Sequence, residues 1–477
     1  MNPTFTSPVR ALAKPPAGGA EAAPVAPPAG AATLDNEINN PLRIFSFQLA
    51  LALVFFRVSA FHQAQTMLMH VNLKLLYVVG IPAILGTILC NGVQRAFRKS
   101  PAFYWTAYWV WMVAACSTSI WPGDSIRKTV VPYLRTDLIM LFIVAGLIVT
   151  WKECLALVKC FAWSAAGSLL VARLFQRSAM ERFALDFGTV SNPNDFAAHL
   201  LFCLPFLYWV VLTSKSIAVR FLSIAGLAFG VIVIVRTGSR GGLIGVLAVA
   251  AMLMVWGSMK QRIAIAALIP VVFLAVVTLV PHATLVRITS FSAGEDEVSS
   301  EALQSSEQRR YLLRKSIEYT FKFPLLGVGP GQFANYEGQH SQVIGTHGLW
   351  HATHNTFTEV SSECGIPALI FFVAGLLVPF KISYSTFKRA RQTPGCEDIR
   401  DVMFCTLLSL VGFTVAITFL NFAYFFYEPL LGGWAIAIAL VTKEEFANRE
   451  RAAQSAPVPR AYGPGFPRVV RPAPSPV

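Results

Sequence analysis

A polar stretch rich in histidine lies directly before one of the long apolar runs of this chain. Residues 346–363 read THGLWHATHNTFTEVSSE and contain His347, His351 and His354. Polar groups at the mouth of a membrane span are costly to keep there unless they serve a purpose. Since imidazole exchanges a proton near neutral pH, His354 is a candidate general base, or a group that orients an acceptor hydroxyl. We therefore take 346–363 as the candidate working site.

Other uses of these histidines stay open. The three could bind a metal ion, although no carboxylate or cysteine completes a convincing ligand set. His354 could also be purely structural, with its ring satisfied by backbone carbonyls. A helix is expected to start near His354. On that helix Asn355, Glu359 and Glu363 would share one face, because they recur at intervals of four residues.

The turn RTGSRGGLIG at 236–245 is a candidate anion receptor. Its glycines allow tight backbone geometry, and Arg240 is placed where a helix begins. The guanidinium, the Ser239 hydroxyl and the free amides of a helix start together suit phosphate oxygens. The alternative is an interfacial arginine that extends toward lipid headgroups. In SNPNDFAAHL at 191–200, the entrance of a span is formed by Asn192, Pro193, Asn194 and Asp195. These residues could cap a helix that follows Pro193, or bind a sugar by hydrogen bonds.

A third cationic element is the predicted helix 305–321, SSEQRRYLLRKSIEYTF. Its arginines are Arg309, Arg310 and Arg314, and its expected apolar stripe is Tyr311, Leu312, Ile317 and Phe321. The helix could simply lie solvated on the membrane surface, or turn one arginine inward toward an anion. The glycine-rich segment 323–333 that follows is expected to be a turn returning the chain to the membrane, since no lysine and no strand-to-helix unit accompany it.

The elements that must position these residues are membrane helices. Of 477 residues, 55% are hydrophobic and 13% charged, and the mean hydropathy is +0.56, which is typical of a membrane protein. About twelve apolar runs approach the ~20 residues that a crossing requires. They lie near 42–60, 72–90, 102–121, 133–151, 153–172, 195–213, 217–236, 241–257, 263–281, 365–381, 402–420 and 424–442. We expect an all-α polytopic fold with one long outer loop that contains short helices. The eight cysteines are expected to be small buried hydrophobic residues.

Basic loops predict the orientation. Residues 91–100, 213–220, 258–262 and 385–400 are all basic and fall on one side, which the positive-inside rule makes cytoplasmic. The expected parts are a disordered Pro/Ala-rich tail at 1–38, nine spans within 39–281, a periplasmic loop at 282–364, three spans within 365–442, and a disordered tail at 443–477. Both tails are then cytoplasmic. Several cations remain outside against this trend, and a subset could face one anionic ligand: Arg127, Lys128, Arg135, Arg173, Arg177, Arg182, Arg240 and those of the long loop.

The order of three motifs resembles the O-antigen ligase and Wzy-type polysaccharide polymerase superfamily. They are TGSRGG at 237–242, PLLGVGPGQF at 324–333 and HATHNTFTEVSSECGIPALIFF at 351–372. Two weaker upstream segments, SIWPGDSIRK at 119–128 and SNPNDFA at 191–197, are also similar to family motifs.

This resemblance implies an inverting, metal-independent glycosyltransferase without a cofactor, at the outer face of the bacterial inner membrane. Its donor would be a glycan on undecaprenyl diphosphate, and its acceptor a second repeat unit or lipid A–core. By position, the pyrophosphate-binding arginines fall on Arg240 and on Arg309 or its neighbour Arg310, and the catalytic histidine on His354. Ser239, Asn355, Glu359 and Asn194 are expected to support them. The competing class is a transporter or flippase of an anionic lipid-linked glycan, with the arginines as its binding path.

Overall fold

Helices make up nearly all of the computed structural model. The structure describes residues 37–176, 182–185, 187–188, 190–282, 284–285, 297–343 and 350–455. The chain divides into two units, Met1–Asn40 and Pro41–Val477, and only the last four residues of the first unit are described. No strand is present among the described residues, where the only β-type pairing is a bridge between Gln176 and Leu185. The all-α prediction is confirmed for this part of the chain.

Seven helical segments in the described part of the chain are long and apolar enough to cross a membrane. They are α2 (Pro41–Val58), the segment Pro122–Leu147 that ends in α8 (Ile139–Leu147), α9 (Trp151–Leu174), α10 (Pro193–Thr213), α11 (Ile217–Arg236), α17 (Thr356–Gln392) and α18 (Glu397–Ile417). Two shorter apolar helices are α4 (Leu75–Leu89) and α12 (Arg240–Trp256). The chain is therefore a multi-pass membrane protein by length and composition of its helices.

Other helices occupy the remaining apolar runs or connect spans. They are α3 (Phe61–Met69), α5 (Gly92–Ala96), α6 (Ser100–Ala115), α13 (Met259–Leu279), α15 (Glu297–Lys322), α16 (Phe333–Val343) and α19 (Tyr427–Ser455). Each of the twelve predicted runs thus contains helix, while their number as membrane crossings stays a prediction. Helix α19 continues past the expected boundary at 442, so the predicted tail begins as helix as far as Ser455. Residues 1–36 and 456–477, where disorder was expected, lie outside the described residues.

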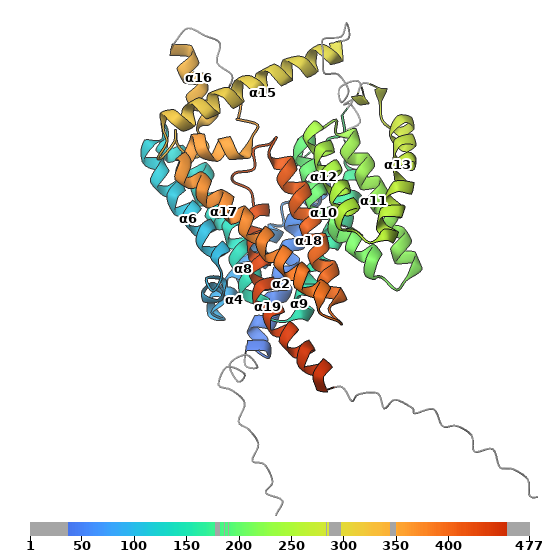
Figure 1. Ribbon diagram of the computed structural model, residues 1–477. Helices are drawn as coiled ribbons and strands as arrows, with labels where there is room; N and C mark the ends of the chain where they lie inside the picture. Colours follow the sequence, from blue (N-terminus) through green and yellow to red (C-terminus); the bar gives the residue numbers. More distant parts are fainter. Residues whose placement is uncertain are drawn as a thin grey trace, which may run out of the picture. The chain divides into compact units, whose positions relative to one another are not determined.

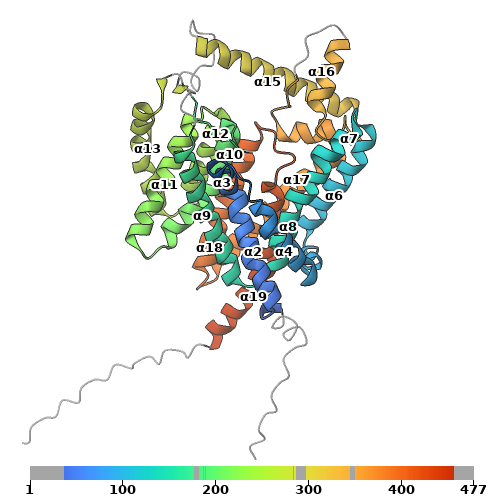
Figure 2. The ribbon, with the colours of Figure 1, turned by 180° about the vertical axis from the view of Figure 1, so that it is seen from behind.

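The bundle core depends on glycines that let large aromatic residues approach neighbouring helices. Trp105 on α6 is fully buried and stacks edge-on against Phe372 of α17 at 5.4 Å between ring centroids. A Cβ at Gly375 or Gly432 would come within 2.8 Å of the Trp105 indole. Helices α6 and α17 therefore pack along their length, as both views of the ribbon show (Figures 1 and 2).

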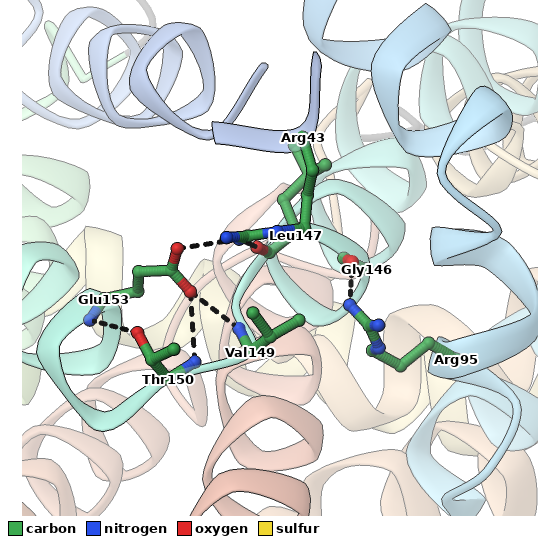
Figure 3. A network of polar contacts seen from close by, with 7 residues as sticks. All are labelled: Arg43, Arg95, Gly146, Leu147, Val149, Thr150 and Glu153. Carbon is green, nitrogen blue, oxygen red and sulfur yellow. Dashed lines mark hydrogen bonds and ion pairs between the residues drawn. The ribbon is translucent and has the colours of Figure 1, made fainter. Parts of the chain in front are cut away.

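Two buried arginines hold the end of α8, on the side that we predict to be cytoplasmic (Figure 3). Arg43 at the start of α2 donates to the Leu147 carbonyl and to Glu153 Oε1, both at 2.7 Å. Arg95 donates to the Gly146 carbonyl at 2.9 Å. The last carbonyls of a helix lack intrahelical partners and carry negative partial charge, so cations there are favourable.

The segment 297–343, which we predict to lie outside the cytoplasm and call the outer segment, is more helical than expected. Helix α15 begins at Glu297, earlier than predicted, and contacts α17; it lies beside α16 at the end of the bundle where α17 begins (Figures 1 and 2). Its predicted apolar stripe is wrong except at Leu312. Leu312, Ser316, Tyr319 and Thr320 are buried, whereas Ile317 and Phe321 are exposed. Polar partners decide the packed face, because the hydroxyls of Tyr311 and Tyr319 both donate to the buried carboxylate of Glu337 on α16.

Candidate functional site

His354 lies just before α17 and not within it. The helix begins at Thr356, and Asn355 is its N-cap, with the side-chain oxygen accepting the Thr358 N–H at 3.0 Å. The expectation of a helix that starts near His354 is thus confirmed, with Thr356 as its first residue. His354 itself has a φ of +54°, in the left-handed region that non-glycine residues rarely adopt. Such a conformation persists only where the surrounding structure imposes it.

The connector between α18 and α19 imposes that conformation. Asn421 accepts the His354 N–H at 3.2 Å through its Oδ1 and donates through Nδ2 to the Thr353 hydroxyl at 3.0 Å. Thr356 is tied to the same connector, since its hydroxyl accepts the Phe422 N–H at 3.1 Å and lies 2.8 Å from the Ile417 carbonyl, to which it donates. The backbone on both sides of His354 is therefore fixed to one element.

The imidazole of His354 is half-buried and close to a positive charge. Burial is the main cause that lowers its pKa to about 4, and the charges of Arg309 and then His351 lower it further. The ring is consequently neutral at pH 7, as a proton acceptor must be. Arg309 is half-buried, whereas Arg310 next to it is exposed. Of these two arginines, Arg309 is the one whose charge lowers the pKa of His354. The sequence spacing alone could not decide between Arg309 and Arg310.

Ser239 and Arg240 stand at the first turn of α12. The buried Ser239 hydroxyl accepts the Gly242 N–H at 3.2 Å and caps the helix, and Arg240 is half-buried. Gly241 lies against the connector, because a Cβ there would come within 3.0 Å of the Phe419 side chain. Phe419 and Asn421 are two residues apart, so this connector contacts both the start of α12 and the His354 segment. No direct contact between Arg240 and His354 is observed among the described residues.

Asn194 meets the same turn through an arginine that the motifs did not single out. Arg182 donates from Nε to the Thr237 carbonyl at 2.8 Å and from Nη2 to Asn194 Oδ1 at 3.1 Å. Asn192 caps α10 by accepting the Asn194 N–H at 2.9 Å, which confirms the capping expectation. The one sequence signal for Arg182 was its place among the cations that are predicted to lie outside, against the positive-inside rule.

Glu359 and Glu363 are buried and hold neighbouring segments. Glu359 Oε2 accepts the Ala423 N–H of the connector at 3.2 Å. Glu363 accepts the Gly331 N–H at 2.7 Å and the Phe333 N–H at 3.0 Å. Their carboxylates therefore order backbone around the site, an arrangement that suits support and not attack on a substrate.

The glycine-rich segment 324–332 is a turn, as predicted, and it docks on a kink in α17. The kink is at Gly365, with φ +84° and ψ 174°. Across it, Gly329 N–H donates to the Glu363 carbonyl at 2.9 Å and Ile366 N–H to the Pro324 carbonyl at 2.7 Å. The turn thus serves to seat the outer segment on α17, beside the helix start that follows His354.

The structure brings the predicted site residues together in two groups. One group is His354, Asn355 and Arg309, and the other is Ser239, Arg240 and Asn194. The α18–α19 connector contacts both groups. Arg310 points to a more exposed position. His347, the first of the three histidines, lies outside the described residues, and His351 is exposed. Seven of the eight cysteines are buried, as expected.

Comparison with known proteins agrees with the motif order. Residues 225–373 match the family model Wzy_C, described as O-Antigen ligase. This range contains all three main motifs and the residues Ser239, Arg240, Arg309 and His354. No curated protein matches the chain. The matched region 225–373 therefore supports the resemblance to the O-antigen ligase and Wzy-type polysaccharide polymerase superfamily that the motifs predicted, in a multi-pass membrane protein.

Proposed function

We propose that this protein transfers a glycan from a polyprenyl diphosphate carrier to a sugar hydroxyl at the outer membrane face. The observation that carries the proposal is the half-buried imidazole of His354, kept neutral by burial and by the nearby charge of Arg309. A neutral base next to a guanidinium suits a reaction in which a hydroxyl loses a proton while an anion departs. The family match supports glycosyl transfer in general.

The step proposed is a single inverting displacement. The acceptor oxygen attacks C1 of the donor sugar, the bond from C1 to the phosphate oxygen breaks, and the diphosphate leaves with the electron pair. His354 takes the acceptor proton, and Arg309 and Arg240 stabilise the charge that develops on the diphosphate. The donor is already activated, so neither ATP nor a metal ion is required in this scheme.

The pairing of Arg309 with His354 also couples donor binding to basicity. In the donor-free protein the Arg309 charge lowers the pKa of His354. A diphosphate bound to Arg309 would offset that charge and add negative charge close by, which favours the imidazolium. The base therefore becomes stronger when its substrate is present.

The membrane arrangement that we propose places this site in the periplasm, with twelve spans in the inner membrane and both tails cytoplasmic. Helix in every predicted run and the basic loops at 91–100 and 385–400 support it. Both an O-antigen or exopolysaccharide polymerase and an O-antigen ligase fit this scheme, because they share the donor and differ in the acceptor. The glycan made by a deletion strain distinguishes the polymerase from the ligase. Single repeat units on lipid A–core indicate that a polymerase was lost, and full-length polymer left on its lipid carrier indicates that a ligase was lost.

Purified protein supplied with lipid-linked repeat units and acceptor tests the activity. Arg240→Ala, Arg309→Ala and His354→Ala should each cut product formation to a small residual rate and leave the protein folded in the membrane fraction. Arg314→Ala is the matched control, since Arg314 is an exposed arginine of the same helix as Arg309. Normal product from all three site variants would refute the proposal. Relocation of the lipid-linked glycan without new glycosidic bonds would indicate the transporter alternative, which the family match does not favour.

A further inference from the structure

A pocket lies far along α17 from the candidate site, near the other end of that helix. Its volume is about 330 Å³, within the range of small-molecule sites. The lining residues are Trp256 at the end of α12, and Tyr384, Phe387, Lys388, Arg391 and Gln392 in the last turns of α17. No residue assigned to glycosyl transfer above takes part in this pocket.

One wall of the pocket is aromatic and preformed. The ring of Trp256 lies 5.3 Å from that of Tyr384 and stacks on that of Phe387 at 6.2 Å. Phe387 is only 5% exposed and stacks in turn on Phe404 of α18 at 5.8 Å, which fixes it in place. Trp256 and Tyr384 keep 37% and 47% of their surface exposed. The wall is thus rigid at its base and open at its mouth.

The rim is cationic. Lys388 and Arg391 are both exposed, and the guanidinium of Arg391 lies 5.7 Å from the centre of the Phe387 ring. No acidic side chain in the described part of the chain forms an ion pair with either of them. By contrast, Arg389 between them turns away to Glu450, at 3.0 Å, and to the Phe446 ring. Two positive charges therefore line the pocket, and no carboxylate among the described residues pairs with them.

The depth of the pocket points to lipid. From the kink, α17 continues over 366–392, which at 1.5 Å per residue is roughly 40 Å, whereas the hydrocarbon core of a bilayer is about 30 Å thick. The last turns of α17 therefore reach headgroup depth, where tryptophan and tyrosine gather and basic residues meet lipid phosphates.

We propose that this pocket binds an anionic glycerophospholipid of the membrane. Lys388 and Arg391 hold the phosphate, and the wall formed by Trp256, Tyr384 and Phe387 packs against the glycerol and the first methylenes of the acyl chains. A free phosphate ion would use only the rim, and it would leave the exposed aromatic surface uncovered. The inference is independent of the glycosyl-transfer proposal, because it concerns neither the donor nor the acceptor.

Lipid binding to the purified full-length protein in detergent tests this inference, with native mass spectrometry counting bound lipids during a titration. Phosphatidylglycerol should bind the wild-type protein, and the double variant Lys388→Gln/Arg391→Gln should bind it roughly 25-fold more weakly, at about fivefold per cation. Lys381→Gln is the matched control, since Lys381 is an exposed lysine of the same helix that does not line the pocket. It should bind as the wild-type protein does. Arg391→Lys, which keeps the charge, should retain most of the binding.

Three further results would overturn the proposal. They are equal affinity in the double variant and the control, phosphatidylcholine binding as tightly as phosphatidylglycerol, and displacement of the lipid by millimolar inorganic phosphate. Because both replaced side chains are exposed, an unchanged thermal unfolding temperature of lipid-free protein should accompany the loss of binding. A lower unfolding temperature would count against the proposal too, since it would show that these side chains act in folding.

Discussion

As the proposed base, His354 is uncommon, because its environment keeps the imidazole uncharged well below neutral pH. Its pKa of about 4 means that the donor-free protein presents a proton acceptor over the whole physiological range. An imidazole with so low a pKa is only a weak base. An anion bound to Arg309 would raise the pKa of His354 and so strengthen the base when the substrate is present. The same pair of residues would then bind the leaving group and prepare the base.

Replacement of Arg309 should move the pH dependence of the reaction. In Arg309→Gln the pKa of His354 should rise above about 4 but stay below 6.5, because burial, the larger cause, remains. The imidazole accepts a proton only above its pKa, so the acid limb of kcat/KM should shift to higher pH in the variant. The measurement is kcat/KM against pH with a lipid-linked donor.

Arg310→Gln is the control, since Arg310 is exposed and does not act on His354. Its acid limb should coincide with that of the wild-type protein, whatever its rate. An unmoved limb in Arg309→Gln would mean that the imidazole is not the titrating base.

Among the helices and turns, Glu363 connects three elements, which are the glycine-rich turn, the start of α16 and the α18–α19 connector. Its carboxylate accepts N–H groups from the turn and from the start of α16, and also the Tyr424 hydroxyl of the connector at 2.5 Å. Each buried donor left without a partner costs about 1–3 kcal/mol. The outer segment is therefore seated on the bundle by one acidic side chain and its neighbours.

Glu363→Ala should lower the stability of the protein by several kcal/mol, on the order of 3, because three donors lose their acceptor. Thermal unfolding of the detergent-solubilised protein measures this. Glu318→Ala removes a carboxylate that is 47% exposed and paired with Lys315 on α15, and it should change stability by less than about 1 kcal/mol. If the two variants unfold at the same temperature, Glu363 does not hold the outer segment in place.

The kink in α17 offers a second test at this scale, with a control built into the chain. Gly365 has φ +84°, and a Cβ there would lie 2.1 Å from the Leu325 carbonyl oxygen; Gly395 has φ +75° with nothing within 4 Å of such a Cβ. Both Gly→Ala changes place a Cβ on backbone with positive φ, which costs on the order of 1–3 kcal/mol. Gly365→Ala should in addition displace the turn, so its unfolding temperature and transferase activity should both fall well below those of Gly395→Ala. Equal losses would show that the docking of the turn is dispensable.

Local signals predicted the starts of helices well. A helix was expected to begin at Arg240 and another after Pro193, and α12 and α10 begin there, because a helix start is decided within about four residues of sequence. The kink in α17 and the left-handed backbone of His354 were not readable, since they depend on bonds such as Ile366 to Pro324 and His354 to Asn421, between residues far apart in the chain. The buried face of α15 was likewise set by Glu337 on another helix.

For the whole molecule, apolar composition predicted where helices lie but not which of them face lipid. In the apolar window of α10 72% of residues are buried inside the protein, against 22% for α11, although both are strongly apolar. Composition cannot separate these cases because lipid tails are as apolar as a protein core.

Reporter fusions should test the proposed sidedness. Alkaline phosphatase is active only outside the cytoplasm, so a fusion that replaces the chain after residue 322, at the end of α15, should be active. A fusion after residue 395, in the basic loop that follows α17, should be inactive and should fluoresce when green fluorescent protein replaces the phosphatase. The reverse pattern would place His354 and its neighbours in the cytoplasm and exclude a periplasmic reaction.

Arg95 shows how one side chain can act at two stages in the life of the molecule. In the nascent chain it is one of the basic residues of the 91–100 loop, which we expect to resist translocation. In the folded protein it is only 5% exposed and caps the end of α8 through the Gly146 carbonyl. Lysine at position 95 would keep the positive charge that retains the loop in the cytoplasm during biosynthesis, but it would weaken the contact with the Gly146 carbonyl. The Arg95→Lys variant would therefore separate defects of membrane insertion from defects of helix packing.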